Sequence, residues 1–580
     1  MSSAPARAER VREAKEALAS LRTLLDDATR HFPLPGGVIS VVDRSGVLDE
    51  IAFGFADIER RHRMESSRRF EIGSISKLFT SLVVNRLIDD GRLHLRETVG
   101  EVLAWLDVPE GMASATVGQL LNHTSGLSVG ADTLADDAAE VWHSRGCSTA
   151  PGFPPRFHYS NLGYLVLGEM VRQRSGRRLA DLVQEQWLGP LGMRGAIAQV
   201  AHHDRATLAT GYWPARPDQP WAPGDPLSPA PFFEIDSASG NVAATSSDMA
   251  SLVQALLGAS ANDPVLDETG EPVLSSAVFE GLTSSPAPSG EPTYLPEGMS
   301  AVLESRYARG INVERIGNNF CVSHGGGMVG YSTFLLVDCT AQFGVVVLTN
   351  ANGDTLASHL LARIVHENVL RRLEGETPSL EYSLDPTVRR DDAKERGSLA
   401  LGVYRSDEEG IELEVAADGE SAPLRVRCGT DEGGLFQLAS GRYVTNNPRL
   451  RRFHLDWFES DEGGGFTWGS ETFRASTAGV PMGSLPARGE MNPLVGHYRS
   501  FSPWYPEFRI LQRGRRLLLV APGGVEAPTD EMDLVEVSPG HYRVGEDSWL
   551  PERLIAGPVR DGEVVSVNRD GCHYSRVFSD

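Results

Sequence analysis

The sequence predicts an α+β domain followed by two small all-β domains. In residues 1–373, strand-like runs open and close the segment, and helical patterns fill its middle. After residue 397 the pattern changes to short alternating runs that are broken by Gly and Asp. A chain of 580 residues is also too long for one ordinary domain, since about 150 residues per domain is usual. We therefore expect a first domain whose sheet is built from both ends of its segment, with a helical insertion between them.

The elements of the first domain follow from its hydrophobic pattern. A charged amphipathic helix leads, and the strand-like runs GVISVVD and IAFGFAD follow, joined by a polar turn. A helical pattern then begins at Ser74 and reaches about Leu93. Further helices are expected at TVGQLLNH (116–123), NLGYLVLGEMVRQ (161–173), LADLVQEQWL (179–188) and MASLVQALL (249–257). Strands return at FCVSH (320–324), STFLLVD (332–338) and GVVVLTN (344–350), before a final helix at 356–373.

The rest of the chain divides into a linker and two β domains. Residues 374–397 are polar, charged and without periodicity, which is typical of a linker. Two similar strand starts, LGVYRS at 401–406 and VGHYRS at 495–500, indicate two tandem small barrels. We expect these barrels to occupy residues 398–488 and 489–580.

Composition excludes several classes of partner. The net charge is −24 and the pI is near 5.1, which argues against nucleic acid and against an anionic membrane surface. The five cysteines are odd in number and show no C-x-x-C spacing, so no disulfide framework, metal or cofactor is expected. No long apolar stretch or signal-like segment is evident, so the cytoplasm is the expected location. The expected partner is a small-molecule or peptide substrate. The sequence leaves open whether the chain also forms a homo-oligomer.

One lysine stands out in a chain that almost always uses arginine. Lys77 is one of three lysines among 54 basic residues, and it follows Ser74 by three positions in EIGSISKLFT. Residues i and i+3 of a helix share a face, so the two side chains can meet. A lysine can accept the proton of a serine hydroxyl, whereas arginine stays protonated. Alternatively, Ser74 is only a helix cap and Lys77 a solvated residue, since S-x-x-K is common by chance.

Two downstream motifs bear on that choice. FHYSNLGY contains Tyr159 and Asn161, and VSHGGGMVGY places His324 at the end of an expected strand. Each has an ordinary structural explanation when taken alone: a buried aromatic ring, a strand-end histidine, a tight glycine turn. It is less favoured that all three structural explanations hold at once, with the motifs in this order, than that the motifs form one catalytic site.

With these three motifs in this order, residues up to Leu373 resemble the serine β-lactamase and penicillin-binding-protein superfamily. The likeness is greatest to the class C-like branch of β-lactamase-related hydrolases, which includes D-aminopeptidases and esterases. LLNHTSGL (120–127), WLGPLGM (187–193) and SGNVAATSSDMASL (239–252) are further landmarks of that branch. The resemblance implies a β-lactamase/transpeptidase-like antiparallel sheet flanked by helices. The β tail resembles the two lipocalin-like barrels of D-aminopeptidases.

The resemblance also implies a role for each matching position. Ser74 would be the acylated nucleophile and Lys77 its proton acceptor. Tyr159 would shuttle a proton between Ser74 and the leaving group, and Asn161 would bind the substrate amide or orient Lys77.

The third motif departs from the family pattern. His324-Gly325-Gly326 stands where true β-lactamases carry K-T-G, which matches peptidases and esterases better than enzymes that bind penicillins. The N–H groups of Ser74 and Gly327, one residue past the motif, would form the oxyanion hole.

Two other motifs do not fit their context. Residues 126–130 match the nucleophile elbow G-x-S-x-G around Ser128, but a helix precedes them where a strand is needed. Residues 325–330 match G-x-G-x-x-G, yet they lead into a strand and not into a helix. Ser247 and Asp248 are interpreted as a helix cap.

We therefore predict a serine hydrolase that acts through a Ser-Lys-Tyr acyl-enzyme on an amide or peptide, with a possible preference for D-residues. Esterase or acyltransferase activity, including peptide cyclisation, is the alternative. A β-lactamase or DD-carboxypeptidase is less favoured, as is a non-catalytic binding or assembly protein.

Overall fold

The computed structural model describes residues 4–577 apart from the following positions: 32, 109, 131–136, 145–155, 217–220, 222–223, 235, 292, 294, 296–298, 353–356, 377–400, 407–410, 418–423, 438–440, 460–463, 477–491, 503, 514 and 522–530.

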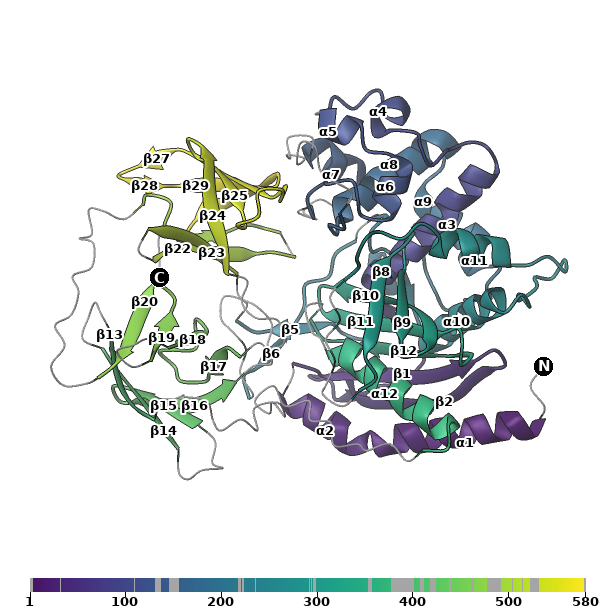
Figure 1. Ribbon diagram of the computed structural model, residues 1–580, viewed down its shortest axis with the longest axis horizontal. Helices are drawn as coiled ribbons and strands as arrows, with labels where there is room; N and C mark the ends of the chain where they lie inside the picture. Colours follow the sequence, from purple (N-terminus) through teal and green to yellow (C-terminus); the bar gives the residue numbers. More distant parts are fainter. Residues whose placement is uncertain are drawn as a thin grey trace.

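The first domain is organised around one antiparallel sheet. Its strands are β1 (Gly36–Asp43), β2 (Gly46–Asp57), β3 (His62–Arg63), β8 (Val302–Tyr307), β9 (Asn312–Ile316), β10 (Asn319–Met328), β11 (Tyr331–Asp338) and β12 (Phe343–Thr349). They lie in the order β3-β2-β1-β12-β11-β10-β9-β8 (Figure 1). Strand β1 pairs with β12 from Gly37 to Asp43, so the two ends of the segment meet in the middle of the sheet. The sequence predicted this arrangement.

Helices cover both faces of the sheet, which explains its apolar central strands. The larger helices are α1 (Ala4–Ser20), α2 (Arg22–His31), α3 (Ser76–Asp89), α8 (Asn161–Ser175), α10 (Ser246–Ser260) and α12 (Ala357–Leu373). All seven residues of β12 are buried. Val345 and Val347 belong to the core under α1 and α12, while Val346 and Leu348 belong to the core under α3, α8 and α10. Successive side chains of a strand point to opposite faces, so a run such as GVVVLT supplies both cores.

Smaller elements fill the insertion and the edges of the first domain. They are α4 (Val99–Val102), α5 (Glu110–Ala113), α6 (Val117–Leu121), α7 (Asp137–Ser144), α9 (Leu179–Val183) and α11 (Ser276–Thr283), with the short strands β4 (Phe70–Glu71), β5 (Tyr212–Pro214), β6 (Leu227–Pro229) and β7 (Ala243–Ala244). Figure 1 shows α4 to α8 grouped at one end of the sheet. This group contributes residues to the site described below.

Three local expectations need adjustment. The leading helix is divided at Leu21 into α1 and α2. The cap of α10 is Thr245, whose hydroxyl accepts from the N–H of Asp248 while the Asp248 carboxylate accepts from the N–H of Thr245. Asp248 therefore completes a capping box, in which the serine or threonine comes first.

The third adjustment concerns the end of β10. This strand does not stop at His324 but runs through the glycines to Met328. Gly325, Gly326 and Gly327 pair with residues 332–334 of β11, so they form part of the ladder and not a tight turn.

Two closed β-barrels follow, as predicted. The first consists of β13 (Gly402–Ser406), β14 (Glu412–Ala417), β15 (Leu424–Cys428), β16 (Asp431–Gln437), β17 (Tyr443–Thr445), β18 (Leu455–Phe458), β19 (Gly465–Trp468) and β20 (Glu471–Ala475). The second consists of β21 (Gly496–Arg499), β22 (Glu507–Arg513), β23 (Arg516–Val520), β24 (Glu531–Ser538), β25 (His541–Val544), β26 (Arg553–Ala556), β29 (Ser566–Arg569) and β30 (Cys572–Arg576). A hairpin of β27 (Val559–Arg560) and β28 (Glu563–Val564) extends from it.

The two similar strand starts occupy equivalent places in the barrels. Tyr404 and Tyr498 are both buried, and each lies in the first strand of its barrel, paired with the last strand. Most of the linker expected at 374–397 lies outside the described residues. Among the described helices, none is both long enough and apolar enough to cross a membrane.

Candidate active site

Ser74 lies in a short 3-10 helix, Gly73–Ile75, that leads directly into α3. Gly73 has a φ of +53°, a conformation that favours glycine. A Cβ at this position would lie 2.6 Å from the carbonyl oxygen of Gly327 and 2.7 Å from its nitrogen. Glycine is therefore required here, because the turn that carries Ser74 touches the backbone of β10.

Lys77 is fully buried one helical turn after Ser74. Its Nζ donates to Ser74 Oγ at 2.9 Å, to Asn161 Oδ1 at 2.7 Å and to the carbonyl oxygen of Ser239 at 2.9 Å. These partners come from three separate segments of the first domain. The structure thus brings Ser74, Lys77 and Asn161 together, and it adds Ser239, which lies in the SGNVAATSSDMASL landmark but carried no predicted role.

Tyr159 and Asn161 approach Lys77 from the start of α8. Ser160 caps this helix, because its hydroxyl accepts from the N–H of Gly163 at 3.0 Å. Asn161 is the first residue after the cap, and the ring of Tyr159 lies with its centroid 5.0 Å from Lys77 Nζ. A buried cation beside an aromatic ring gains from the electron density of the ring face.

His123 holds the segment that carries Tyr159. Its carbonyl oxygen accepts from the N–H of His158 at 2.8 Å, and its Nδ1 accepts from the N–H of Ser160 at 3.1 Å. Its ring lies 4.3 Å from the ring of Tyr159, centroid to centroid. Burial, followed by the charge of Lys77, holds the pKa of His123 well below its usual value. LLNHTSGL is one of the family landmarks in the sequence, and these contacts give its histidine a structural role, because His123 fixes the turn that carries Tyr159.

His324 faces the same cluster from β10. Its Nε2 lies 2.8 Å from the hydroxyl of Tyr307, and its Nδ1 lies 2.6 Å from the carbonyl oxygen of Gly325. Since a carbonyl only accepts, Nδ1 carries the proton and Nε2 accepts from Tyr307. Burial lowers the pKa of His324 to about 3, so the ring is neutral at physiological pH. A neutral ring offers no positive charge to a substrate carboxylate.

The glycines of β10 lie against the turn that carries Ser74. A Cβ on Gly326 would come within 1.9 Å of the carbonyl oxygen of Ile72. The nitrogen of Gly327 lies next to Gly73, as described above. The N–H groups of Ser74 and Gly327 thus belong to adjoining pieces of backbone, which the predicted oxyanion hole requires.

Ser128 is a poor nucleophile candidate in the structure. It is buried, with 1% of its surface exposed, and its carbonyl oxygen accepts from the Ser160 hydroxyl at 2.6 Å. The described segment before it contains α6 and no strand. Its position supports the Tyr159 turn and does not match a nucleophile elbow.

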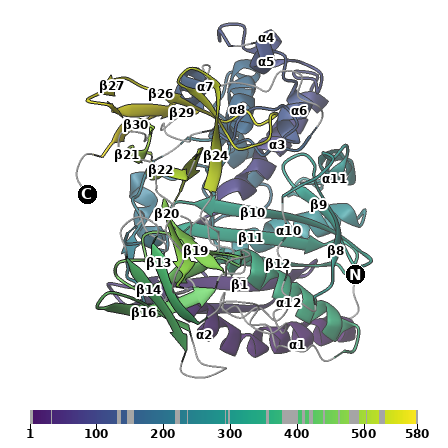
Figure 2. The ribbon, with the colours of Figure 1, turned by 60° about the vertical axis from the view of Figure 1, so that its left-hand side comes forward.

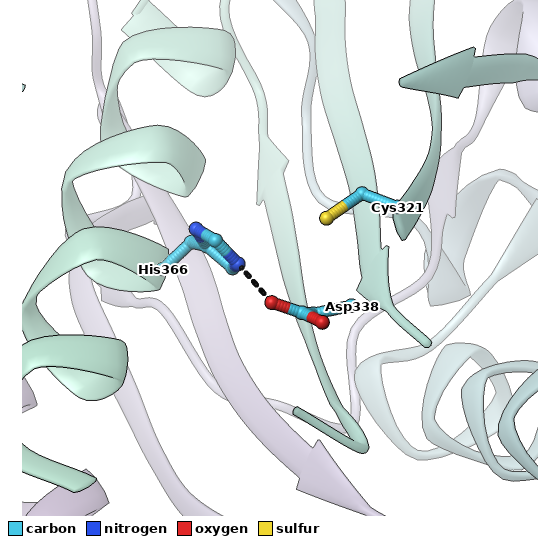
Figure 3. Close-up of side chains that lie close together, drawn as sticks. All are labelled: Cys321, Asp338 and His366. Atoms are coloured by element: carbon cyan, nitrogen blue, oxygen red, sulfur yellow. Dashed lines mark hydrogen bonds and ion pairs between the residues drawn. The ribbon is translucent and has the colours of Figure 1, made fainter. Parts of the chain in front are cut away.

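One group of described side chains resembles a metal site. The ligand atoms of Cys321, Asp338 and His366 all lie within 4.8 Å of one another, and Figure 3 shows Asp338 and His366 in contact beside the thiol. Asp338 Oδ2 accepts from His366 Nε2 at 2.9 Å and from Asn319 at 2.7 Å. Its Oδ1 accepts from two backbone N–H groups, and burial raises the pKa of the Cys321 thiol far above its usual range. A protonated thiol and a fully engaged carboxylate suit an internal hydrogen-bond network better than an ion.

Two curated proteins are similar to the chain in sequence. Protein flp of Staphylococcus aureus (strain MW2) is 23% identical over 361 residues, which is 59% of this chain and 66% of that protein. The match thus spans slightly less than two thirds of Protein flp. A D-aminopeptidase of Cereibacter sphaeroides is 26% identical over 433 residues, 71% of this chain and 72% of that protein.

Two solved structures were also matched. The octameric penicillin-binding protein homologue from Pyrococcus abyssi is 20% identical, with a TM-score of 0.49, covering 79% of this chain and 99% of that one. D-amino acid amidase from Ochrobactrum anthropi SV3 is 18% identical, with a TM-score of 0.48, covering 62% of this chain and 99% of that one.

The family model described as Beta-lactamase matches residues 23–368, more than half of the chain. This range contains the sheet, most of its helices apart from α1, and every predicted site residue from Ser74 to Gly327. The chain belongs to the beta-lactamase family of serine hydrolases and carries two closed β-barrels behind the family domain.

Proposed function

We propose that the protein hydrolyses an amide or peptide bond through an acyl-enzyme formed on Ser74. The observation that carries the proposal is the 2.9 Å contact between Lys77 Nζ and Ser74 Oγ, with Lys77 fully buried. Such a contact lies within the reach that a general base needs in order to remove the serine proton.

The proposed reaction has two stages, acylation of Ser74 and hydrolysis of the ester. Ser74 Oγ attacks the substrate carbonyl carbon while its proton passes to Lys77 Nζ. The negative charge that develops on the carbonyl oxygen is stabilised by the N–H groups of Ser74 and Gly327, worth about 3 kcal/mol per donor. Tyr159 delivers a proton to the leaving nitrogen and regains one from Lys77, and the C–N bond breaks. Water then attacks the ester by the reverse sequence, which releases the acid and restores Ser74.

The neutral His324 favours substrates that present no carboxylate at this position. Penicillins and the C-terminal carboxylates of peptides would gain no ion pair from it, which counts against β-lactamase and carboxypeptidase activity. The D-aminopeptidase relative supports an aminopeptidase or amidase, and it supports a preference for D-residues. Esters and acyl transfer would use the same acyl-enzyme, so esterase or acyltransferase activity is the second candidate.

The test is covalent labelling of Ser74 followed by a substrate screen. Intact-protein mass spectrometry after treatment with a small fluorophosphonate should show one adduct on the peptide that contains Ser74. Ser74→Ala should abolish this adduct, and the matched control Ser128→Ala should keep it. Labelling at Ser128 would contradict the proposal and favour the nucleophile-elbow interpretation of residues 126–130. No labelling of a folded protein would leave a binding protein as the better description.

Turnover then separates the candidate activities. D- and L-aminoacyl anilides, chromogenic esters and nitrocefin should be compared at equal enzyme concentration. We expect the highest kcat/KM for a D-aminoacyl anilide. Faster turnover of esters alone would favour the esterase, and hydrolysis of nitrocefin above all others would refute the argument from His324.

Three broader features belong to the same proposal. The division into residues 1–373, 374–397, 398–488 and 489–580 can be tested by limited proteolysis, with cleavage expected first at the linker. A homo-oligomer can be tested by light scattering on the purified protein. The cytoplasmic location stays a prediction that cell fractionation would test.

A further inference from the structure

The second barrel contacts the first domain beside Tyr159. Figures 1 and 2 show this barrel next to the helical group that contains α7 and α8. The connection between β25 and β26 carries Glu552, and a single oxygen of this carboxylate, Oε1, makes two contacts across the domain boundary. It accepts from the N–H of Val129 at 3.2 Å and lies 2.7 Å from His158 Nε2.

This contact is shielded from solvent. The side chains of His158 and Glu552 are only 13% and 11% exposed. The ring of Trp549, from the same connection, lies edge-on to His158 at 5.7 Å, and the guanidinium of Arg156 lies 5.5 Å from that indole ring. Burial alone would raise the pKa of Glu552, but the hydrogen bond and the charge of His158 lower it overall. Glu552 therefore remains a carboxylate at neutral pH, and it is held more firmly than an exposed partner would be.

The barrel holds Glu552 in place from its own side. Arg553 Nη1 donates to the carbonyl oxygens of Leu550 at 2.7 Å and Glu552 at 2.9 Å. The N–H of Arg553 donates to Asp570 Oδ1 at 2.9 Å. The carboxylate is thus presented by a connection that is braced on a closed β scaffold, which suits a positioning role.

The two groups that Glu552 binds are both connected to the segment that carries Tyr159 and Asn161. Val129, whose N–H binds Glu552, accepts through its carbonyl oxygen from the N–H of Asn161 at 2.8 Å. Asn161 in turn accepts from Lys77. His158 directly precedes Tyr159 in the chain. Two short paths therefore run from one oxygen of the barrel to the two side chains that face Lys77.

We propose that Glu552 is a positioning residue for acylation: by fixing Val129 and His158 it sets the places of Asn161 and Tyr159 against Lys77. This proposal rests on the proposed function of Ser74. On this proposal the second barrel positions the groups that react at Ser74, and its role is not limited to substrate selection. Loss of Glu552 should therefore slow even a reagent too small to reach the barrel.

The test compares labelling rates at Ser74 in the full-length protein. Glu552→Ala removes both contacts, and a displacement of about 1 Å can cost up to about 100-fold in rate, so we expect at least about tenfold slower labelling by a small fluorophosphonate. Glu552→Gln should keep most of the rate, because both contacts use one oxygen and an amide oxygen can accept them. Glu552→Asp keeps the charge but shortens the side chain, and it should fall between the two.

Glu531→Ala is the matched control. Glu531 lies in the same barrel, and its carboxylate pairs with Arg513 at 2.8 Å and with Arg442 of the first barrel at 3.2 Å. This variant should label at the wild-type rate, with a circular-dichroism melt to establish folding for every variant. Should Glu552→Ala not fold, the Asp and Gln variants decide: Asp slower than Gln supports positioning, and equal wild-type rates overturn it.

The steady-state parameters add a second readout. With an amide substrate, positioning predicts that Glu552→Ala lowers kcat while KM changes less than kcat does. Normal labelling combined with a raised KM alone would overturn the proposal in favour of a substrate contact. Failure of the wild-type protein to label at Ser74 would instead refute the proposed function.

Discussion

Replacing Gly326 by alanine, in strand β10, should slow the acylation of Ser74 and lower the stability of the protein. A Cβ at this position would lie 1.9 Å from the carbonyl oxygen of Ile72 and 2.3 Å from Thr333 Oγ1. A carbon and an oxygen that touch without bonding stay about 3.3 Å apart. The backbone of Ile72 and β10 must therefore separate by about 1.4 Å, since a carbonyl of the main chain cannot turn aside as a flexible side chain can.

The displacement has two measurable consequences. Ile72 lies two residues before Ser74, so the nucleophile would move away from Gly327 and open the predicted oxyanion hole. A shift of about 1 Å can cost about 100-fold in rate. Overpacking of this kind also costs about 1–3 kcal/mol of stability. Both effects should appear together, in the fluorophosphonate labelling rate of Ser74 and in the free energy of unfolding in urea.

Gly325 supplies the control in the same strand. A Cβ there would meet Phe334 at 3.7 Å, which is ordinary contact, and it would point to the opposite face of the sheet. Ser74 should therefore be labelled in Gly325→Ala within about threefold of the wild-type rate, because no atom has to move to make room for the methyl group. The reasoning would be refuted by a Gly326→Ala protein with wild-type labelling and stability, or by equal losses in the two variants.

The remaining predictions concern single groups. Lys77→Arg keeps the charge but cannot accept a proton, so kcat should fall by about 100-fold or more while the protein still folds; near-normal turnover would make Lys77 only structural. Arg363 forms a buried bidentate pair with Glu314, both contacts at 2.7 Å. Arg363→Met should cost about 3–5 kcal/mol in urea unfolding because it strands the carboxylate, and Glu314→Gln in that background should recover part of it. Burial lowers the pKa of His324 and His359 to about 3, while the unfolded chain binds these protons near pH 6.5. The free energy of unfolding should thus fall between pH 7 and 5, by up to about 1.4 kcal/mol per pH unit for each imidazole; a flat profile would contradict their burial in the neutral form.

The sequence predicts the fold well where its pattern is local. Runs such as GVVVLT are apolar throughout because β12 is buried on both faces, and the barrels show as short alternating strands. Ser74 and Lys77 were recognisable because one helical turn separates them. Their meeting with Asn161 depended on family order, since no periodicity connects residues that lie 84 positions apart.

Other features of the site were beyond such reasoning for a physical reason. His123 acts through its backbone and one ring nitrogen, and a single histidine in a loop gives no sign of which neighbour it will hold. Glu552 meets His158 from 394 positions away, across a domain boundary, and nothing near Glu552 in the sequence differs from an ordinary barrel loop. The extent of β10 was underestimated because a glycine triplet is more typical of a turn than of a strand.

Three of the acceptors around Lys77 would also orient the proton transfer in the proposed reaction. An ammonium group has three N–H bonds and can satisfy Ser74, Asn161 and Ser239 at once. A neutral amine has only two N–H bonds and one lone pair. Asn161 Oδ1 and the carbonyl oxygen of Ser239 can only accept, whereas the Ser74 hydroxyl can also donate. Among these three partners, Ser74 is therefore the one that can donate to the lone pair. In the proposed reaction the Ser74 hydroxyl would turn from acceptor to donor, and its proton would then point at the amine of Lys77.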